Sequence, residues 1–210
     1  MLATVASGGA NASSPTSTEW REYAGGPGRD KYSALEQINR DNVAQLELAW
    51  THHTGDMSTS YGFMESNPLV IDGVLYATTA KLKVIALDPT SGKQLWRFDP
   101  YDGGEAKQTL NRGVAYWKGR RGPRILFTAG HFLQSLDARS GRLDTSFGQN
   151  GRVDLRVGLR DDPANVYVDA TSPGVVYKDS IIVGTRTGEG VVSAPGDIPA
   201  FHLHTGKLKR

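Results

Sequence analysis

The chain has 210 residues, and its 24 Lys and Arg nearly balance its 22 Asp and Glu, so no charge excess points to nucleic acid or an anionic membrane. It contains no cysteine, which excludes disulfides, thiolate metal ligands and cysteine nucleophiles. No apolar run approaches the roughly 18 residues that a membrane-spanning helix needs. The 25 glycines and 10 prolines favour many short strands joined by turns over long helices.

The first 18 residues, MLATVASGGANASSPTST, are small and mostly polar. They lack the basic start and the long apolar stretch of a complete signal peptide, so we expect a disordered segment. The triplet at 10–12, Ala-Asn-Ala, resembles a cleavage site and leaves open a residual export signal. Residues 19–210 are interpreted as one domain.

Two elements are predicted before the hairpins begin. A short helix is expected at 40–46, with Asn39 or Asp41 as its cap. The alternation of apolar and polar residues in LELAWT then predicts a strand at 46–51.

The chain then reads as a series of hairpins. The Asp72-Gly73 pair separates two apolar runs and is a strong signal for a two-residue hairpin turn. The predicted strands of this first unit are 68–71, 74–78, 83–87 and 93–98.

The same four-strand course returns twice. The predicted strands of the second unit are 114–117, 124–129, 132–136 and 142–147, and those of the third include 174–177, 180–184 and 198–203. The turn glycines Gly92, Gly141 and Gly206 are 49 and 65 residues apart, which fits four-stranded units of about 40 to 50 residues with one insertion. Strand-only repeats of this size predict an all-β propeller.

The first repeat carries the motif AxDxxxGxxxW at 86–96, ALDPTSGKQLW. Gly92 can adopt the positive φ of the turn, and Asp88 can accept hydrogen bonds from the backbone and from an indole N–H. Trp96 has a large apolar face and can wedge between adjacent blades. The second copy keeps the aspartate and the glycine but has Thr145 at the tryptophan position, so the motif decays along the chain.

AxDxxxGxxxW is the tryptophan-docking motif of the eight-bladed quinoprotein propellers. Four further segments occur in family order: YAGGPGRDKYSALEQINRDNVAQLELAWTHHTGD, ESNPLVIDGVLYATT, NRGVAYW and TSPGVVYKDSIIVG. Over residues 20–206 the chain resembles the amino-terminal part of the dehydrogenases that depend on pyrroloquinoline quinone (PQQ), closest to the glucose dehydrogenase branch. The resemblance implies about three blades of an eight-bladed propeller, and thus a fragment.

The resemblance implies an oxidoreductase that uses PQQ and calcium and oxidises CH–OH groups of sugars. The sugar branch is favoured because methanol-dehydrogenase-like members carry an adjacent cysteine pair where this chain has EAKQ at 105–108. The alternatives are a PQQ-dependent alcohol dehydrogenase and a non-catalytic scaffold of the outer-membrane assembly type. The scaffold proteins need a lipidated cysteine near the amino terminus, and this chain has none.

The expected partners are a small sugar or alcohol and an electron acceptor such as a quinone or cytochrome c, with no nucleic acid. The expected location is the periplasm, and a membrane association of the full-length protein stays open. The family's catalytic aspartate, a calcium-binding asparagine and the tryptophan that stacks on PQQ are expected downstream of residue 210. We therefore assign no catalytic residue and expect the isolated chain to be inactive and prone to aggregation.

PQQ is a planar ortho-quinone with three carboxylates. By resemblance, Arg112 pairs with one of these carboxylates, Glu65 lies near the polar edge of the cofactor, and Thr171 and Ser172 hydrogen-bond its rim. Glu189 falls where alcohol-oxidising relatives place a calcium ligand. The residues alone also allow plainer roles: an arginine closing a blade turn, solvated loop carboxylates, and hydroxyls that cap a turn.

Overall fold

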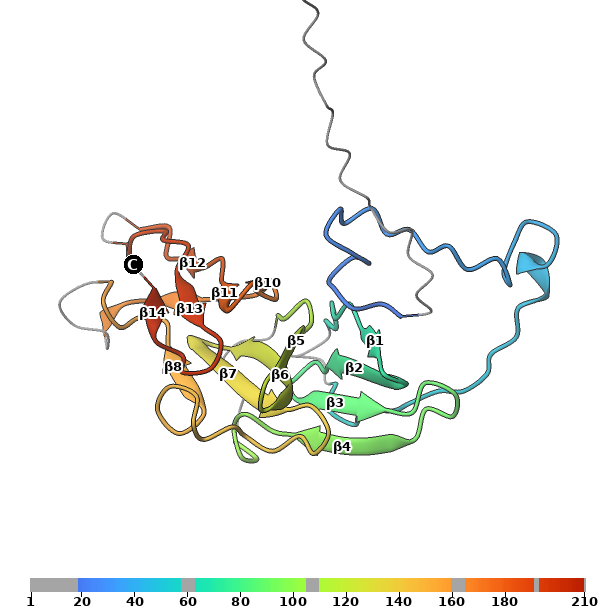
Figure 1. Cartoon of the computed structure of the whole chain (residues 1–210), viewed down its shortest axis with the longest axis horizontal. Helices are drawn as coiled ribbons and strands as arrows, with labels where there is room; N and C mark the ends of the chain where they lie inside the picture. The colour runs from blue at the N-terminus through green and yellow to red at the C-terminus, as the bar shows by residue number, and fades with distance from the viewer. Residues whose placement is uncertain (1–18, 58–62, 105–109, 160–164, 191–192, 210) are drawn as a thin grey trace, which may run out of the picture.

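The computed structural model describes residues 19–57, 63–104, 110–159, 165–190 and 193–209, and its strands form three four-stranded antiparallel sheets (Figure 1). Each sheet is a meander whose strands follow one another in chain order. The predicted disordered or export-signal segment at 1–18 lies outside the described residues, as does the EAKQ segment. No helix in the described part of the chain is long and apolar enough to cross a membrane.

The first sheet has the strands that the sequence predicts. They are β1 (Leu69–Ile71), β2 (Val74–Thr78), β3 (Val84–Leu87) and β4 (Gln94–Phe98). Asp72 and Gly73 connect β1 to β2 with φ angles of 50° and 73°. Both turn residues lie in the left-handed region, as a two-residue hairpin that matches the strand twist requires.

The second sheet departs from the prediction at its fourth strand. It contains β5 (Ala115–Gly119), β6 (Gly122–Ala129), β7 (Phe132–Asp137) and β8 (Arg152–Asp154). The strand predicted at 142–147 is wrong, because only Leu143 forms an isolated bridge there, with Leu136. Asp144 then accepts hydrogen bonds from the backbone and hydroxyl of Ser146 and turns the chain away until β8 pairs with β7.

The third sheet confirms the prediction. It contains β10 (Val175–Tyr177), β11 (Ser180–Ile182), β13 (Ala200–His202) and β14 (Leu208–Lys209). A separate two-stranded sheet pairs β9 (Val168–Asp169) with β12 (Arg186–Thr187). The sequence did not predict this pair, because two-residue strands are too short to show an alternating pattern.

The predictions for residues 40–51 are wrong. The helix is a single 3-10 turn, η1 (Val43–Gln45), without a side-chain cap. Residues 46–51 form no strand, because the segment has no strand to pair with among the described residues. Trp50 nevertheless ties this segment to the first sheet, as described below.

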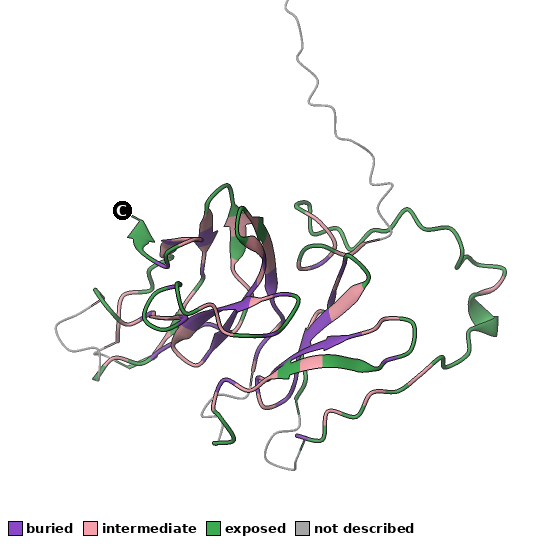
Figure 2. Ribbon diagram, turned by 60° about the horizontal axis from the view of Figure 1, so that its bottom comes forward, coloured by how far each residue is buried: buried purple, intermediate pink, exposed green. Residues whose placement is uncertain are grey.

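The core lies between the sheets, which stand face to face as propeller blades do (Figures 1 and 2). One buried cluster joins the first two sheets and includes Ile71, Val84 and Phe127. The other joins the second and third sheets and includes Leu126 and Phe201. Neighbouring residues of β6 thus point into different clusters, so this strand is covered on both faces. The predicted all-β fold, a partial propeller of about three blades, is confirmed.

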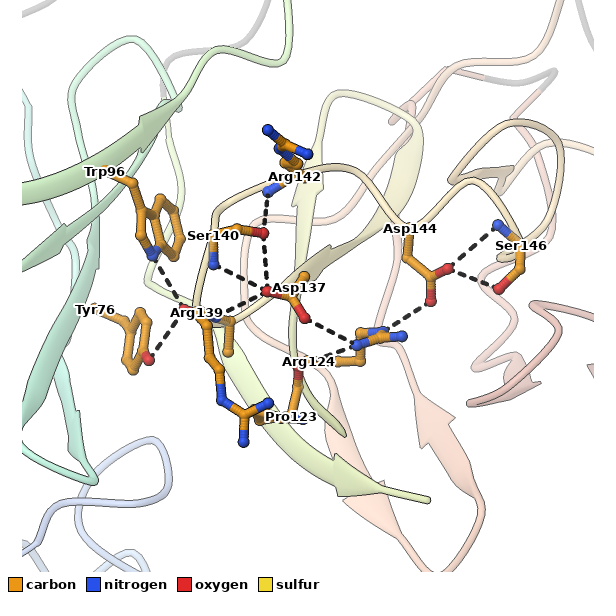
Figure 3. Close-up of polar contacts among 11 residues, drawn as sticks. Tyr76, Trp96, Pro123, Arg124, Asp137, Arg139, Ser140, Arg142, Asp144 and Ser146 are labelled. Atoms are coloured by element: carbon orange, nitrogen blue, oxygen red, sulfur yellow. Dashed lines mark hydrogen bonds and ion pairs between the residues drawn. The ribbon is translucent and has the colours of Figure 1, made fainter. Parts of the chain in front are cut away.

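A tryptophan joins the first two blades. The indole Nε1 of Trp96 donates a hydrogen bond to the carbonyl of Ala138 at 3.0 Å, as Figure 3 shows. The indole also covers Gly141, where an added Cβ would lie 2.5 Å from its ring. The predicted wedge between blades is confirmed, and Gly141 is needed both for this contact and for its φ of 69°.

Trp50 repeats this docking on the first blade. Its indole donates to the carbonyl of Pro89 at 3.1 Å and covers Gly92 so closely that a Cβ there would clash. Pro89 and Ala138 each follow the aspartate of their motif. The prediction that Asp88 accepts an indole N–H is therefore wrong: its carboxylate accepts from Thr90 and Ser91 within its own turn.

Arg124 braces the turn on which Trp96 docks (Figure 3). Its side chain is only 12% exposed and contacts Asp137 at 3.4 Å and Asp144 at 2.8 Å. Burial by itself would raise the pKa of Asp137, but hydrogen bonds from Ser140 and the charge of Arg124 outweigh it and lower that pKa. The ionised carboxylate is thus the form that holds this turn.

We expect Gly141→Ala to lower the free energy of unfolding by about 2 to 5 kcal/mol, because left-handed strain adds to a clash with Trp96. Trp96→Ala should by itself remove about 3 kcal/mol. In the Trp96→Ala protein, Gly141→Ala should lower the free energy of unfolding only by the backbone strain, about 1 to 2 kcal/mol. Urea unfolding of the four proteins measures this cycle.

Gly73→Ala is the matched control for this cycle, since Gly73 also has a positive φ but no atom within 4 Å of an added Cβ. Its cost should be the same with and without Trp96. Additive effects of Trp96→Ala and Gly141→Ala would show that the indole does not press on this turn.

Candidate functional site

Three of the residues singled out by the sequence come together where the first strands of the blades begin. Glu65 precedes β1, Arg112 precedes β5 and Thr171 precedes β10. Their segments are joined by backbone hydrogen bonds, from the amide of Asn67 to the carbonyl of Arg112 at 3.0 Å and from the amide of Arg112 to the carbonyl of Thr171 at 2.8 Å. All three blades thus contribute to one site.

Arg112 is the centre of this cluster. Its Nε lies 3.2 Å from a carboxylate oxygen of Glu65, and its Nη1 donates to Thr171 Oγ1 at 2.9 Å. Its Nη2 forms no hydrogen bond or ion pair with the described residues, and the side chain is 34% exposed. One face of the guanidinium is therefore held by the protein, while the remaining nitrogen can bind an anion.

A buried asparagine supports the arginine from below. The side-chain oxygen of Asn111 accepts from the amide of Gly113 at 2.7 Å and from the hydroxyl of Thr78, and its amide donates to the carbonyl of Thr128. The hydroxyl of Thr128 in turn donates to the carbonyl of Ala170 at 2.6 Å. This polar layer joins the three blades under the site. The NRG segment was recognisable in the sequence, but no role was predicted for its asparagine, Asn111.

Gly113 allows the blades to approach this closely. Its φ is 128°, and an added Cβ would lie 2.8 Å from the backbone oxygen of Asn67. A side chain at this position would push apart the segments that carry Glu65 and Arg112.

The other two predicted site residues are not part of this cluster. Ser172 follows Thr171 directly, but it is exposed and forms no hydrogen bond with the described residues. Glu189 is exposed and follows β12, where its charge acts on Arg186. Within the described ranges no group of three His, Asp or Glu side chains could hold a metal ion. The role of Glu189 as a calcium ligand stays a prediction.

A second polar cluster, which was not predicted from the sequence, includes Asp169, two residues before Thr171. Asp169 is 5% exposed and accepts a hydrogen bond from the hydroxyl of Tyr167 at 2.8 Å. Arg186 donates to the Tyr167 hydroxyl at 2.5 Å and lies 3.5 Å from the Asp169 carboxylate. The pairing of β9 with β12 brings these side chains together, and the sequence carries no clear signal for it.

Burial raises the pKa of Asp169, and the hydrogen bond from Tyr167 and the charge of Arg186 offset this only in part. Tyr101 lies near the same carboxylate, and its buried hydroxyl has no hydrogen-bond partner among the described residues. Burial, together with the charge of Asp169, raises the pKa of Tyr101 to about 12. Burial thus disfavours the ionised form of both groups.

The Arg112 cluster suits an anionic ligand. The free nitrogen of Arg112 can pair with a carboxylate, and the 60% exposed Arg186 is a further cation of the third blade. The hydroxyl of Thr171 accepts from Arg112 and can donate its own proton to a ligand oxygen. These groups fit the carboxylates of PQQ.

Three four-stranded antiparallel sheets that stand face to face (Figure 1) define the chain as part of a β-propeller. Residues 20–209 match the family model described as "Glucose/ethanol/alcohol dehydrogenase, beta-propeller domain". The chain therefore belongs to this family of PQQ-dependent dehydrogenases, and the family predicted from the sequence is confirmed.

Curated relatives of both branches match over most of the chain. The dehydrogenase subunit of the quinone alcohol dehydrogenase of Gluconobacter oxydans is 34% identical over 90% of this chain. The quinoprotein glucose dehydrogenase A of Acinetobacter calcoaceticus is 32% identical over 91% of it. The chain spans only 24% and 27% of the length of these relatives. Their similar identities do not favour the sugar branch over the alcohol branch.

A solved structure supports the fold. A quinohemoprotein alcohol dehydrogenase from Pseudomonas putida HK5 superposes with a TM-score of 0.68 at 27% identity, over 90% of this chain and 26% of that protein. The blades described here thus have the arrangement of a quinoprotein propeller.

Asp169 gives this part of the molecule a pH dependence. Its raised pKa means that the folded state prefers the neutral acid, so its contribution to stability is full below about pH 4 and is lost as the pH rises through the raised pKa. Asp169→Asn stays neutral. In urea unfolding, the wild type should therefore lose stability relative to Asp169→Asn as the pH rises from about 4 to 7.

Asp41→Asn controls for the loss of one exposed negative charge. A wild type that instead gained stability relative to Asp169→Asn with rising pH would show that Arg186 and Tyr167 dominate over burial.

Proposed function

We propose that this chain forms part of the cofactor site of a PQQ-dependent dehydrogenase that oxidises a CH–OH group of a sugar or an alcohol. The observation that carries the proposal is the cluster of Glu65, Arg112 and Thr171, which draws on all three blades and leaves one nitrogen of Arg112 free. Membership of the family supports the choice of cofactor.

In this proposal each residue of the cluster has a defined task. Glu65 and Thr171 hold the guanidinium of Arg112 in one orientation, and its free Nη2 binds a carboxylate of the cofactor. Thr171 then directs its hydroxyl proton towards the rim of the cofactor, and Ser172, exposed beside it, can do the same. The bound quinone supplies the hydride acceptor for the reaction. Asn111 carries no charge and acts only by fixing the backbone on either side of Arg112.

The substrate and the setting are proposed at a coarser level. The segment at 105–108, which lacks the cysteine pair of methanol-dehydrogenase-like proteins, favours a sugar. Calcium is proposed as a second cofactor with Glu189 as one ligand, and the remaining ligands would have to come from outside the described residues. A quinone or cytochrome c as electron acceptor and a periplasmic location complete the proposal.

Titration of the full-length gene product with PQQ tests the cofactor site. We expect Arg112→Ala to raise the dissociation constant by about tenfold or more, because a charge-assisted pair is lost. Arg40→Ala, which removes an exposed arginine beside η1, should leave it unchanged. Equal dissociation constants for Arg112→Ala and the wild type would remove Arg112 from the site.

Dye reduction by the same full-length protein, loaded with PQQ and calcium, tests the substrate class. We expect turnover with glucose to exceed turnover with ethanol. The reverse order would assign the protein to the alcohol branch, and no PQQ-dependent turnover with either would overturn the proposed function.

A further inference from the structure

A cavity of about 260 Å³ lies between the amino-terminal segment and the first strands of the second and third blades. Its lining comes from residues 21–29, from β5 and from β10 with the residues before it. The backbones of Trp20 and of Val70 in β1 exchange two hydrogen bonds. These bonds fix the start of the amino-terminal segment against the first blade. The lining includes the apolar residues Val114, Ala115, Gly174 and Val176.

Three aromatic side chains line the same cavity: Tyr23, Tyr116 and Trp117. The indole of Trp117 is held in place by two neighbours. It lies over Gly119, where an added Cβ would clash with its ring. The ring of His204 packs edge-on against it, with 4.6 Å between the centroids. Planar apolar groups can stack on such fixed aromatic walls.

The charged groups of the cavity are mainly cations. Arg21 is already paired with Glu19 and Asp72. Arg29 and Lys118 form no ion pair with the described residues. Arg29 lies over the ring of Tyr23, 5.7 Å from its centroid, and its own φ of 50° is in the left-handed region. Only one carboxylate, that of Glu22, lines the cavity with these cations.

We propose that this cavity is a second ligand site, which binds a small aromatic carboxylate. The ring would stack on Trp117, and the carboxylate would pair with Arg29 and Lys118. An inorganic anion would use the cations but not the aromatic walls, and a neutral ring would use the walls but leave both cations unpaired. The combination favours a ligand that carries both features.

This site is distinct from the Arg112 cluster. Arg112 precedes β5 and Lys118 lies near its end, so about 20 Å of nearly extended chain separates them. The proposal therefore does not depend on PQQ binding or on the proposed function.

Titration of the full-length gene product with 2-naphthoate tests the proposal, followed by calorimetry and by the indole N–H signal of Trp117 in NMR, which Trp117→Phe assigns. We expect saturable binding that shifts the signal of Trp117. Arg29→Gln and Lys118→Gln should each weaken binding by about tenfold. The neutral analogue 2-naphthamide should bind at least about tenfold more weakly for the same reason.

Arg121→Gln is the matched control, because it removes an exposed cation from the same β5–β6 hairpin without changing the lining of the cavity. Its affinity should equal that of the wild type. An equal loss in Arg121→Gln would assign the binding to general surface charge. Unchanged affinity in both Arg29→Gln and Lys118→Gln, equal binding of the amide, or no binding at all would overturn the proposal. Amide NMR spectra identify a variant that fails to fold. Arg29 and Lys118 lie on separate segments, so if one variant fails to fold, the other still tests the proposal.

Discussion

The packing of an indole over a glycine turn is the interaction on which the rest of the structure depends. Trp96 crosses from the first blade to the second, donates to Ala138 and occupies the space that a side chain at Gly141 would need. Trp50 makes the same contact with the turn at Gly92. A large rigid ring with a single donor fixes both the distance and the rotation between the two segments that it joins. A purely apolar contact would constrain their relative rotation less.

The third blade shows how the same space is filled without a tryptophan. Thr145 stands at the tryptophan position of the second motif, and the chain leaves the sheet there. The turn at Gly206 is instead contacted by the side chain of Val153, 2.6 Å from where its Cβ would be, and by the backbone of Gly148. The amide of Gly148 donates to the carbonyl of Thr205 at 3.0 Å, in place of an indole N–H. The displaced strand β8 is thus linked to the loss of the motif.

Once the blades are fixed, their first strands must begin side by side, and this creates the polar sites. Backbone hydrogen bonds connect the segments of Glu65, Arg112 and Thr171, and buried Asn111 ties them to the strands beneath. Arg112 lies before the strand β5 and Lys118 lies near its end. One rigid strand would therefore hold the two proposed sites apart, which a flexible loop could not do.

The sequence alone determined the blades of the fold and much of the first site. Strands with alternating apolar and polar residues, the Asp72-Gly73 turn and the docking motif are local patterns. Local patterns can be recognised in the sequence without the tertiary structure. The NRG segment likewise pointed to Arg112. Only the tertiary structure decided that 46–51 is not a strand, since a strand exists only with a partner, and that Asp169 lies beside Arg186. It also decided that Arg29 and Lys118 share a cavity, because such contacts join residues far apart in the chain and no sequence spacing specifies them.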